Sequence, residues 1–189
     1  MGSELLWHVT MSLDGFIAGP GHTMDWMPRS AEPSVIADEL IATTGALLVG
    51  RRTYEVEERD RGGFYGGAWT GPFFVLTHDA PAKVPEWMTG TFVDERIDRA
   101  VARASDAAGG NNVVVFGADV ARQCIDGGLL DEIVVHLAPV LLGNGVRLFD
   151  APNRVDLENM GIAQSGQLTD LRFRVVKEPR SSLKERSPR

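Results

Sequence analysis

Apolar and polar residues alternate in the first stretch of the chain and then give way to turn residues. Between Leu5 and Ser12 every second side chain falls on one side of an extended backbone, which predicts a β-strand. Two glycine-containing turns over 14–21 follow it, so a long loop replaces a tight hairpin turn. The loop carries Asp25 and Trp26 before any helix begins. Loops of this length at strand ends often hold ligands.

Three later segments are short and wholly apolar. They read "ALLVG" at 46–50, "FFVLT" at 73–77 and "VVVF" at 113–116. Continuous apolar runs of this length are typical of strands that are covered on both faces. Together with the first strand they predict a largely parallel sheet.

Helical spacing of apolar residues separates these strands. It predicts helices over 33–44, over 51–59, over 94–108 and after Gly117. The order of elements therefore alternates strand and helix, as parallel sheets with helical crossovers do.

The pattern changes after residue 131. "EIVVHL", "PVLLGNGVRLF" and "LRFRVV" indicate strands that no helix separates, so we expect antiparallel strands at the sheet edge. The prediction is one α/β domain over 1–177, with a mostly parallel central sheet. Residues 178–189 are basic and poor in apolar residues, and we expect a disordered tail there.

Composition and charge narrow the functions. With 189 residues and 43% hydrophobic content, the chain can bury one substantial core. Its net charge of −7 opposes general binding to nucleic acid or to an anionic membrane. No signal-peptide pattern or membrane-length apolar run occurs, so we expect a cytoplasmic protein. The scattered histidines predict no metal site, and Cys124 is expected to be a buried structural thiol.

Three predicted strands end in turns that could bind a ligand. Gly50 is followed by Arg51, Arg52 and Thr53 at a helix start, either an anion site or a capped helix with two solvated arginines. Gly117 precedes a second helix start, where Asp119 can cap the helix and the free N–H groups can face a pyrophosphate. A tight turn that merely needs a glycine is the alternative there.

The turn after Leu76 and Thr77 completes the set, and by itself it is only a loop. In open parallel sheets ligands bind outside the carboxyl ends of the strands. We therefore expect these turns and the first loop to line one cleft.

As an ordered set, four segments resemble a known family. They are "MSLDGFIAG", "LLVGRRTYE", "VVVFGADVARQCIDGGLLDEIVVHLAPVLLGNGVRLF" and the final strand. The set is similar to the dihydrofolate-reductase-like superfamily, and within it to the reductase domain of the bifunctional riboflavin-biosynthesis deaminase-reductase and its stand-alone relatives. The resemblance implies a three-layer sandwich, an NADPH-dependent oxidoreductase and a pyrimidine or pterin-like substrate. A homodimer is also expected, with the C-terminal strands as a possible edge.

The resemblance further implies site residues. The cofactor contacts would be Val9, Thr10, Ile17, Ala18, Gly50, Arg51, Arg52, Thr53, Leu76, Thr77, Phe116, Gly117, Ala118, Asp119 and Val120. Arg51 or Arg52 would favour NADPH over NADH by meeting the 2′-phosphate.

The same resemblance places Ser12 and Asp14 as catalytic residues on the substrate side, although Asp14 equally fits a turn-forming role. The substrate contacts would be Asp25, Trp26, Leu142 and Gly143.

Two other functions remain open. A dihydrofolate or dihydropterin reductase would need a pocket carboxylate from the first helix, with Glu32 or Asp38 as candidates. A non-catalytic nucleotide-binding protein would keep the fold without the reaction. The substrate stays open because Phe16 occupies a position that commonly carries a basic residue in riboflavin-pathway reductases.

Overall fold

A computed structural model describes residues 3–27, 34–57, 62–80 and 90–177, and the structural statements below concern these ranges. The main sheet consists of β1 (Leu5–Ser12), β3 (Thr44–Gly50), β4 (Phe73–Leu76), β5 (Thr91–Val93), β6 (Asn112–Phe116), β7 (Glu132–Ala138), β9 (Leu157–Ser165) and β10 (Leu168–Val175). A small antiparallel sheet joins β2 (Phe16–Ala18) to β8 (Val146–Arg147) near the end of β1.

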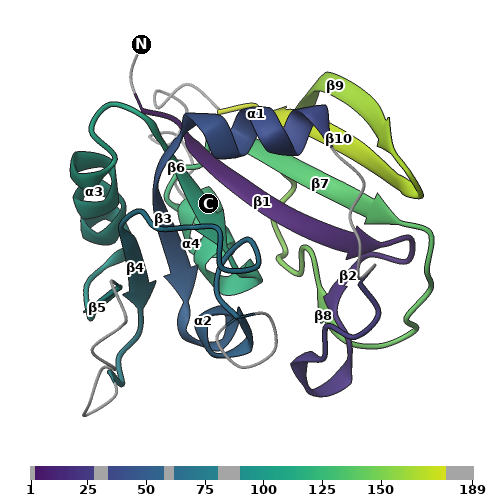
Figure 1. Ribbon diagram of the computed structural model, residues 1–189, viewed down its shortest axis with the longest axis horizontal. Coiled ribbons are helices and arrows are strands. Elements are labelled where there is room, and N and C mark those ends of the chain that lie inside the picture. The colour runs from purple at the N-terminus through teal and green to yellow at the C-terminus, as the bar shows by residue number, and fades with distance from the viewer. Residues whose placement is uncertain (1–2, 28–33, 58–61, 81–89, 178–189) are drawn as a thin grey trace, which may run out of the picture.

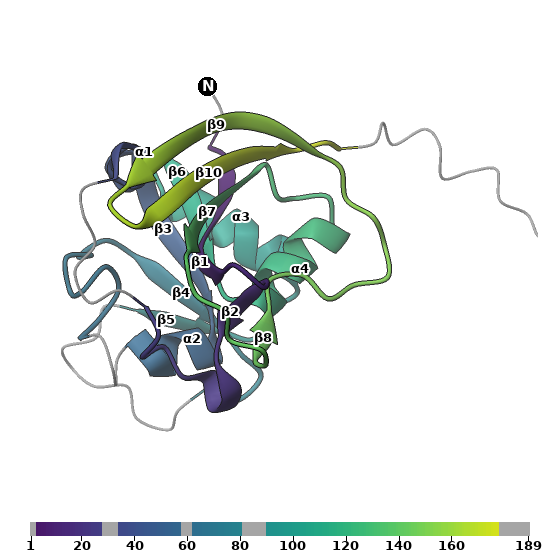
Figure 2. The ribbon, with the colours of Figure 1, turned by 90° about the vertical axis from the view of Figure 1, so that its right-hand side faces the viewer.

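The strands of the main sheet lie in the order β5-β4-β3-β6-β1-β7-β10-β9. All pairings from β5 to β7 are parallel, whereas β10 runs antiparallel to β7 and β9 antiparallel to β10. Figure 2 shows β9 and β10 as a long curved hairpin at one edge. The predicted mostly parallel sheet with antiparallel C-terminal strands is therefore confirmed.

Some strand predictions missed. β5 and β9 were not predicted, because β5 is very short and β9 contains Gly161 and few regularly spaced apolar residues. The segment "PVLLGNGVRLF" was predicted as a strand, but only Val146–Arg147 pairs in it. Its proline and glycines interrupt the hydrogen-bonding ladder elsewhere.

Helices cover both faces of the sheet (Figure 1). They are α1 (Val35–Thr43), α2 (Arg51–Val56), α3 (Ile97–Ala107) and α4 (Ala118–Asp126), with a short 3-10 turn at Pro20–His22. Alternate residues of each central strand enter different cores. In β3, Ala46 and Leu48 pack with α3 and α4, while Leu47 and Val49 pack on the side of α1. The result is a three-layer arrangement.

The sheet order determines where a ligand can bind. β1 lies between β6 and β7 in the middle of the sheet, and the carboxyl ends of the parallel strands share one edge. A topological switch point at such an edge leaves a crevice. Cys124 is fully buried in the core between the sheet and the helices α3 and α4, as expected of a structural thiol. Among the helices of the described residues, none combines the length and hydropathy that crossing a bilayer requires.

Candidate active site

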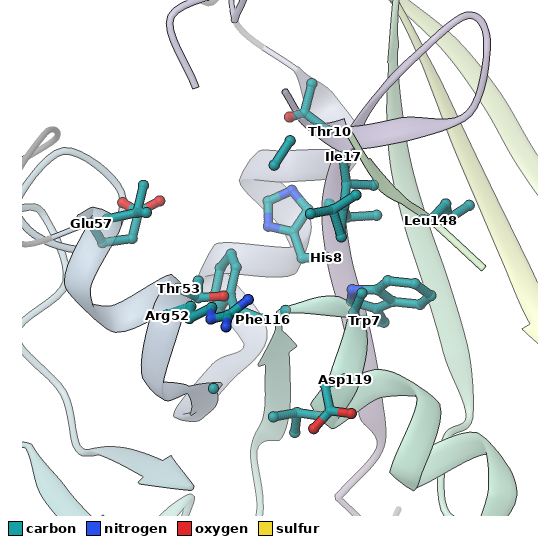
Figure 3. Close-up of a pocket in the computed structure, with 18 of the residues that line it drawn as sticks. Trp7, His8, Thr10, Ile17, Arg52, Thr53, Glu57, Phe116, Asp119 and Leu148 are labelled. Carbon is teal, nitrogen blue, oxygen red and sulfur yellow. The ribbon is translucent and has the colours of Figure 1, made fainter. Parts of the chain in front are cut away.

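One large cavity, of about 1810 Å³, opens along the carboxyl ends of the strands. Figure 3 shows part of its lining, with Trp7 and His8 of β1 on one side of the view and Thr53 and Phe116 on the other. Every residue predicted to contact the cofactor lines this cavity: Val9, Thr10, Ile17, Ala18, Gly50, Arg51, Arg52, Thr53, Leu76, Thr77, Phe116, Gly117, Ala118, Asp119 and Val120. The expected convergence of the turns is thus present, while their contact with a cofactor stays a prediction.

The two glycine-containing turns pack against each other. Gly117 has φ +98°, and a Cβ atom at this position would lie 2.7 Å from Thr53 Oγ1. A Cβ at Gly50 would lie 3.3 Å from a Val120 methyl group. Glycine at 117 therefore serves both an unusual backbone angle and a close approach.

The start of α4 carries no side-chain cap. Gly117 occupies the cap position, and the Asp119 carboxylate instead accepts hydrogen bonds from Arg122 (2.8 Å) and Gln123 (2.9 Å). The prediction that Asp119 caps this helix is wrong, because its carboxylate is drawn along the helix surface by two side chains. The first N–H groups of α4 consequently lack a partner from a capping side chain.

The two arginines after Gly50 point to different parts of the cavity. Arg51 Nε donates to Glu55 Oε1 at 2.5 Å, and its Nη1 donates to the carbonyl of Asp79. Arg52 Nη1 lies 2.7 Å from His22 Nε2. Arg51 therefore lies at the turn after β4, while Arg52 reaches the loop after β2.

A buried donor without a partner also faces this space. Trp7 is buried and lines the cavity, and its Nε1–H has no hydrogen-bond partner among the described residues. An unpaired buried donor costs about 1–3 kcal/mol.

The predicted catalytic pair lies outside the cavity lining. The Asp14 carboxylate accepts hydrogen bonds from Ser12 Oγ (2.7 Å), from the Leu142 amide (3.0 Å) and from the Gly143 amide (2.7 Å). The Ser12 hydroxyl, first of all, and the two amides lower the pKa of Asp14 to about 2. Ser12 Oγ also accepts a bond from the Phe16 amide.

These bonds give Ser12 and Asp14 a structural role, while their assignment as catalytic residues stays a prediction. The pair fastens the turn before β2 to the loop after β7, so both side chains are occupied in holding backbone. Asp25, Trp26, Leu142 and Gly143, predicted to contact substrate, also lie outside the cavity lining.

A buried polar chain, which the sequence did not predict, crosses the floor of the cavity. His8 Nδ1 lies 3.2 Å from the Tyr65 hydroxyl, and His8 Nε2 lies 2.6 Å from His136 Nε2. His136 Nδ1 lies 2.6 Å from Asp170 Oδ1, and the other oxygen of Asp170 accepts bonds from Ser34 and Ser165.

The strand register explains how this chain forms. β1, β7 and β10 are adjacent, and Asp170 is paired directly with His136 across the β7–β10 ladder. Side chains two residues apart on a strand share a face, so His8 points to the same side as Leu6, the α1 side. Spacing along the sequence carries no trace of this grouping, because each histidine is a single residue on its own strand.

Charge states within the chain follow from its surroundings. Burial and then the neighbouring His136 lower the pKa of His8 to about 3, which leaves the ring neutral. Burial acts to raise the pKa of Asp170, but bonds from Ser165, Ser34 and His136 outweigh it and the net shift is downward. Asp170 is therefore a carboxylate held by three donors.

Comparisons with known proteins agree with this fold. The chain is 26% identical over 182 residues to the uncharacterized protein YwjB of Bacillus subtilis (strain 168), covering 92% of this chain and 98% of that protein. It is similar to the structure of a putative riboflavin biosynthesis protein from Shewanella sp. PV-4, with a TM-score of 0.77, 23% identity and coverage of 92% and 99%.

A longer protein shares the fold over part of its length. This is the diaminohydroxyphosphoribosylaminopyrimidine deaminase/5-amino-6-(5-phosphoribosylamino)uracil reductase of Thermotoga maritima, with a TM-score of 0.65 and 13% identity. The match covers 93% of this chain and 57% of that protein.

A family model provides the assignment. The model described as the RibD C-terminal domain matches residues 70–170, which is more than half of the chain. The matched range contains the β6–α4 turn, strand β7 with His136 and the first residues of β10 as far as Asp170. The chain therefore belongs to the RibD C-terminal domain family, whose reductase fold it shares.

Proposed function

We propose that this protein is an NADPH-dependent reductase of a pyrimidine or pterin-like small molecule. The observation that supports it most is the cavity of about 1810 Å³ at the carboxyl ends of the strands. Pockets for a single small ligand usually measure about 300–1,000 Å³. This cavity has room for a dinucleotide and a second molecule beside it.

The cavity residues fit a nicotinamide dinucleotide. A side chain at Gly117 would fill the space against Thr53, and the start of α4 offers N–H groups without a capping side chain. Such helix starts bind phosphates. When bound, reduced NADPH supplies a hydride.

The protein's own residues would bind and orient this ligand. Arg51, with Thr77 nearby in the same turn region, would meet the adenosine 2′-phosphate, because its guanidinium lies at the turn after β4. Arg52 would meet the phosphates between the two nucleosides. Ile17 and Ala18, buried on β2, would form an apolar wall that excludes water from the reacting end.

Arg147 places a positive charge near Phe16, so the proposal includes phosphorylated substrates. The Arg147 guanidinium lies 4.9 Å from the centre of the Phe16 ring, and Arg147 lines the cavity. Although Phe16 replaces a basic residue, the paired strand β8 thus brings a positive charge to the same place.

The dihydropterin reductase alternative has less support. It needs a buried carboxylate from the first helix, whereas Asp38 of α1 lines the cavity but is exposed. Glu32 lies outside the described residues. The buried carboxylate of this cavity region is Asp170, which comes from β10 instead.

Titration of the purified protein with NADPH and with NADH tests the cofactor half. Arg51→Ala is expected to weaken NADPH binding by about 1.5–3 kcal/mol, roughly 10- to 150-fold in Kd, and NADH binding much less. Arg52→Ala should weaken both nucleotides by similar factors. Arg154→Ala is the matched control, because Arg154 is also paired with a carboxylate, Asp156, but does not line the cavity. If the wild type binds neither nucleotide, the proposal fails.

The substrate half is tested by NADPH oxidation. The panel contains 5-amino-6-(5-phosphoribosylamino)uracil, its dephosphorylated form and dihydrofolate. Turnover with either pyrimidine supports the proposal, and turnover with dihydrofolate alone supports the pterin alternative. Nucleotide binding with no oxidation across the panel would favour the non-catalytic alternative.

A further inference from the structure

The buried polar chain ends at a side chain that faces the cavity. Its members are Tyr65 on the loop before β4, His8 on β1, His136 on β7 and Asp170 on β10. We propose that these four residues form a proton relay, and that the Tyr65 hydroxyl at its open end donates the proton the substrate needs when its polar double bond is reduced. This inference rests on the proposed reductase function.

Hydrogen-bond counting, with His8 kept neutral as its low pKa requires, allows the chain only two proton arrangements. The Asp170 carboxylate can only accept, so His136 Nδ1 carries a proton in both. If His136 is neutral, its Nε2 accepts from His8 Nε2–H, and His8 Nδ1 accepts from the Tyr65 hydroxyl. The Tyr65 proton then points inward, away from the cavity.

The second arrangement holds one more proton. His136 then carries protons on both nitrogens, and its positive charge lies against the Asp170 carboxylate. His8 Nε2 becomes an acceptor, His8 Nδ1–H donates to the Tyr65 oxygen, and the Tyr65 O–H must turn elsewhere. Since Tyr65 lines the cavity, its hydroxyl becomes a donor towards a ligand. His8 stays neutral in both arrangements, in accord with its low pKa.

Proton delivery converts the second arrangement into the first. The Tyr65 O–H bond breaks as its proton passes to a nitrogen or oxygen of the substrate. The His8 Nδ1 proton moves to the Tyr65 oxygen, and the His136 Nε2 proton moves to His8 Nε2. Hydride and proton together complete a two-electron reduction, with NADPH as reductant. Tyr65 never becomes a phenolate, which burial and Glu57 disfavour by raising the pKa of its hydroxyl.

The backbone at Tyr65 points to a function beyond packing. Its φ is +56°, a left-handed conformation that costs a non-glycine residue roughly 1–2 kcal/mol. The ring stacks on His8 with centroids 5.8 Å apart and meets Phe116 edge-on at 5.6 Å. These contacts hold the hydroxyl at the boundary between the histidines and the cavity.

Other charged groups near the relay are few among the described residues. Glu57 acts on Tyr65 from the end of α2, and Asp38 of α1 lines the same cavity. Glu132 of β7 lies on the side of His136, where it is paired with Arg172 at 2.7 Å. Among the described residues, His136 has Asp170 as its carboxylate partner and Glu132 is bonded to Arg172, so the proton exchange runs through the four named residues.

Nitrogen-15 NMR of histidine-labelled protein tests the relay without a substrate. The protein has four histidines, and His22→Gln and His78→Gln identify the remaining two signals. At neutral to basic pH we expect His8 protonated at Nε2 and His136 at Nδ1. On acidification the pair should take up one proton while His8 changes to the Nδ1–H form.

Removal of the Tyr65 hydroxyl should alter the proton uptake of the His8–His136 pair. Tyr65→Phe removes the partner of His8 Nδ1 in both arrangements, and a buried N–H left unpaired costs more than an unpaired ring nitrogen, so the proton affinity of the pair should fall. Tyr54→Phe removes the other tyrosine hydroxyl, outside the cavity lining, and should leave the change in place. The relay is overturned if His8 rests as the Nδ1–H form, if it never changes while the protein stays folded, or if Tyr65→Phe has no effect.

Turnover provides a second readout with the substrate that the panel identifies. Tyr65→Phe should lower kcat about a hundredfold or more, as loss of a general acid does, with the Kd for NADPH changed less than about twofold. Tyr54→Phe should turn over like the wild type. An unaltered kcat in Tyr65→Phe would overturn the relay while leaving the reductase intact. Failure of the wild type to bind NADPH would instead overturn the proposed function.

Discussion

The two ends of the cavity are built in different ways. At the end where we propose that the nucleotide binds, two backbone turns and their adjoining residues line the cavity: Gly50 to Thr53 in one turn and Gly117 to Val120 in another. At the other end, single side chains meet from distant strands, with His8 and His136 separated by 128 residues along the chain and His8 and Tyr65 by 57. The first end depends on local backbone geometry and the second on strand register.

The two ends of the cavity should differ in how well they tolerate substitutions. A turn that binds through backbone N–H groups accepts many side chains, provided that its glycine is kept. A buried chain of hydrogen bonds has no such freedom, because removal of one member leaves its neighbours unpaired. We therefore expect substitutions in the histidine chain to have larger effects on stability than substitutions in the turns.

The largest expected effect is on the pH dependence of stability. The folded pKa of His8, about 3, lies below its unfolded value of 6.5. Between these values the unfolded chain binds a proton that the folded protein does not, so the free energy of unfolding falls as the pH falls. From pH 6.5 to about pH 4 this group should cost about 3 kcal/mol of stability, measured by urea unfolding.

His8→Gln should remove this part of the slope. The variant is expected to lose less stability on acidification than the wild type, although it is less stable at neutral pH because the polar chain is cut. His78→Gln is the control, because His78 is exposed and paired with Asp94 at the surface. Equal slopes for the wild type and His8→Gln would show that His8 titrates as freely in the folded protein as in the unfolded chain.

A smaller effect is expected from the glycine turn. Gly117 and Gly15 have similar positive φ angles, +98° and +89°, but a Cβ at Gly15 would meet nothing within 4 Å. Gly15→Ala should therefore report backbone strain alone, about 1 kcal/mol. Gly117→Ala should cost about 2 kcal/mol, because Thr53 must also turn its hydroxyl away from the new methyl group.

Nucleotide titration separates the two glycine variants further. Gly117→Ala should weaken NADPH binding, whereas Gly15→Ala should leave it near the wild-type value, since Gly15 does not line the cavity. Equal losses of stability and equal binding in the two variants would mean that the close approach of the turns has no energetic role.

The difference between local turns and strand register also explains what the sequence could predict. Apolar runs such as 46–50 and 113–116 predicted buried parallel strands, and "VGRRTYE" and "VVVFGADV" predicted turns at their ends, because these signals are contiguous. The grouping of His8, His136 and Asp170 depends on which strands are neighbours and in what register. A single histidine in an apolar strand carries no such information, and only the assembled sheet provides it.

Asp14 shows the converse, a local pattern that leaves two roles open. Its place in "MSLDGFIAG" attracts a catalytic interpretation by resemblance, but a carboxylate next to a glycine also suits a turn, and local sequence does not distinguish the two. The partners that show its role in holding backbone are the Leu142 and Gly143 amides. They lie 128 and 129 residues further along the chain.

The smallest expected effect concerns the bonds from the Leu142 and Gly143 amides to Asp14, which tether the loop after β7 to the turn before β2. Asp14→Ala should speed hydrogen exchange at the Leu142 and Gly143 amides, because both lose their acceptor. The Leu13 amide, which donates to the Val140 carbonyl, is an internal reference and should keep its protection. The wild-type tether should also loosen as the pH falls from 3.8 towards about 2, where the carboxylate takes up a proton.

Turnover distinguishes a tether from a catalytic group. A tether acts by holding β2 and its apolar wall in place, so Asp14→Ala should raise KM while kcat falls less than in Tyr65→Phe. Ser12→Ala removes one donor to Asp14 and leaves the two amide bonds, so its effect should be smaller still. If Asp14→Ala abolishes kcat while the two amides stay protected, Asp14 takes part in the chemistry. In that event, the Asp14 carboxylate would serve both in anchoring backbone and in catalysis. The division between an end built from backbone turns and an end built from single side chains would then not hold at the turn before β2.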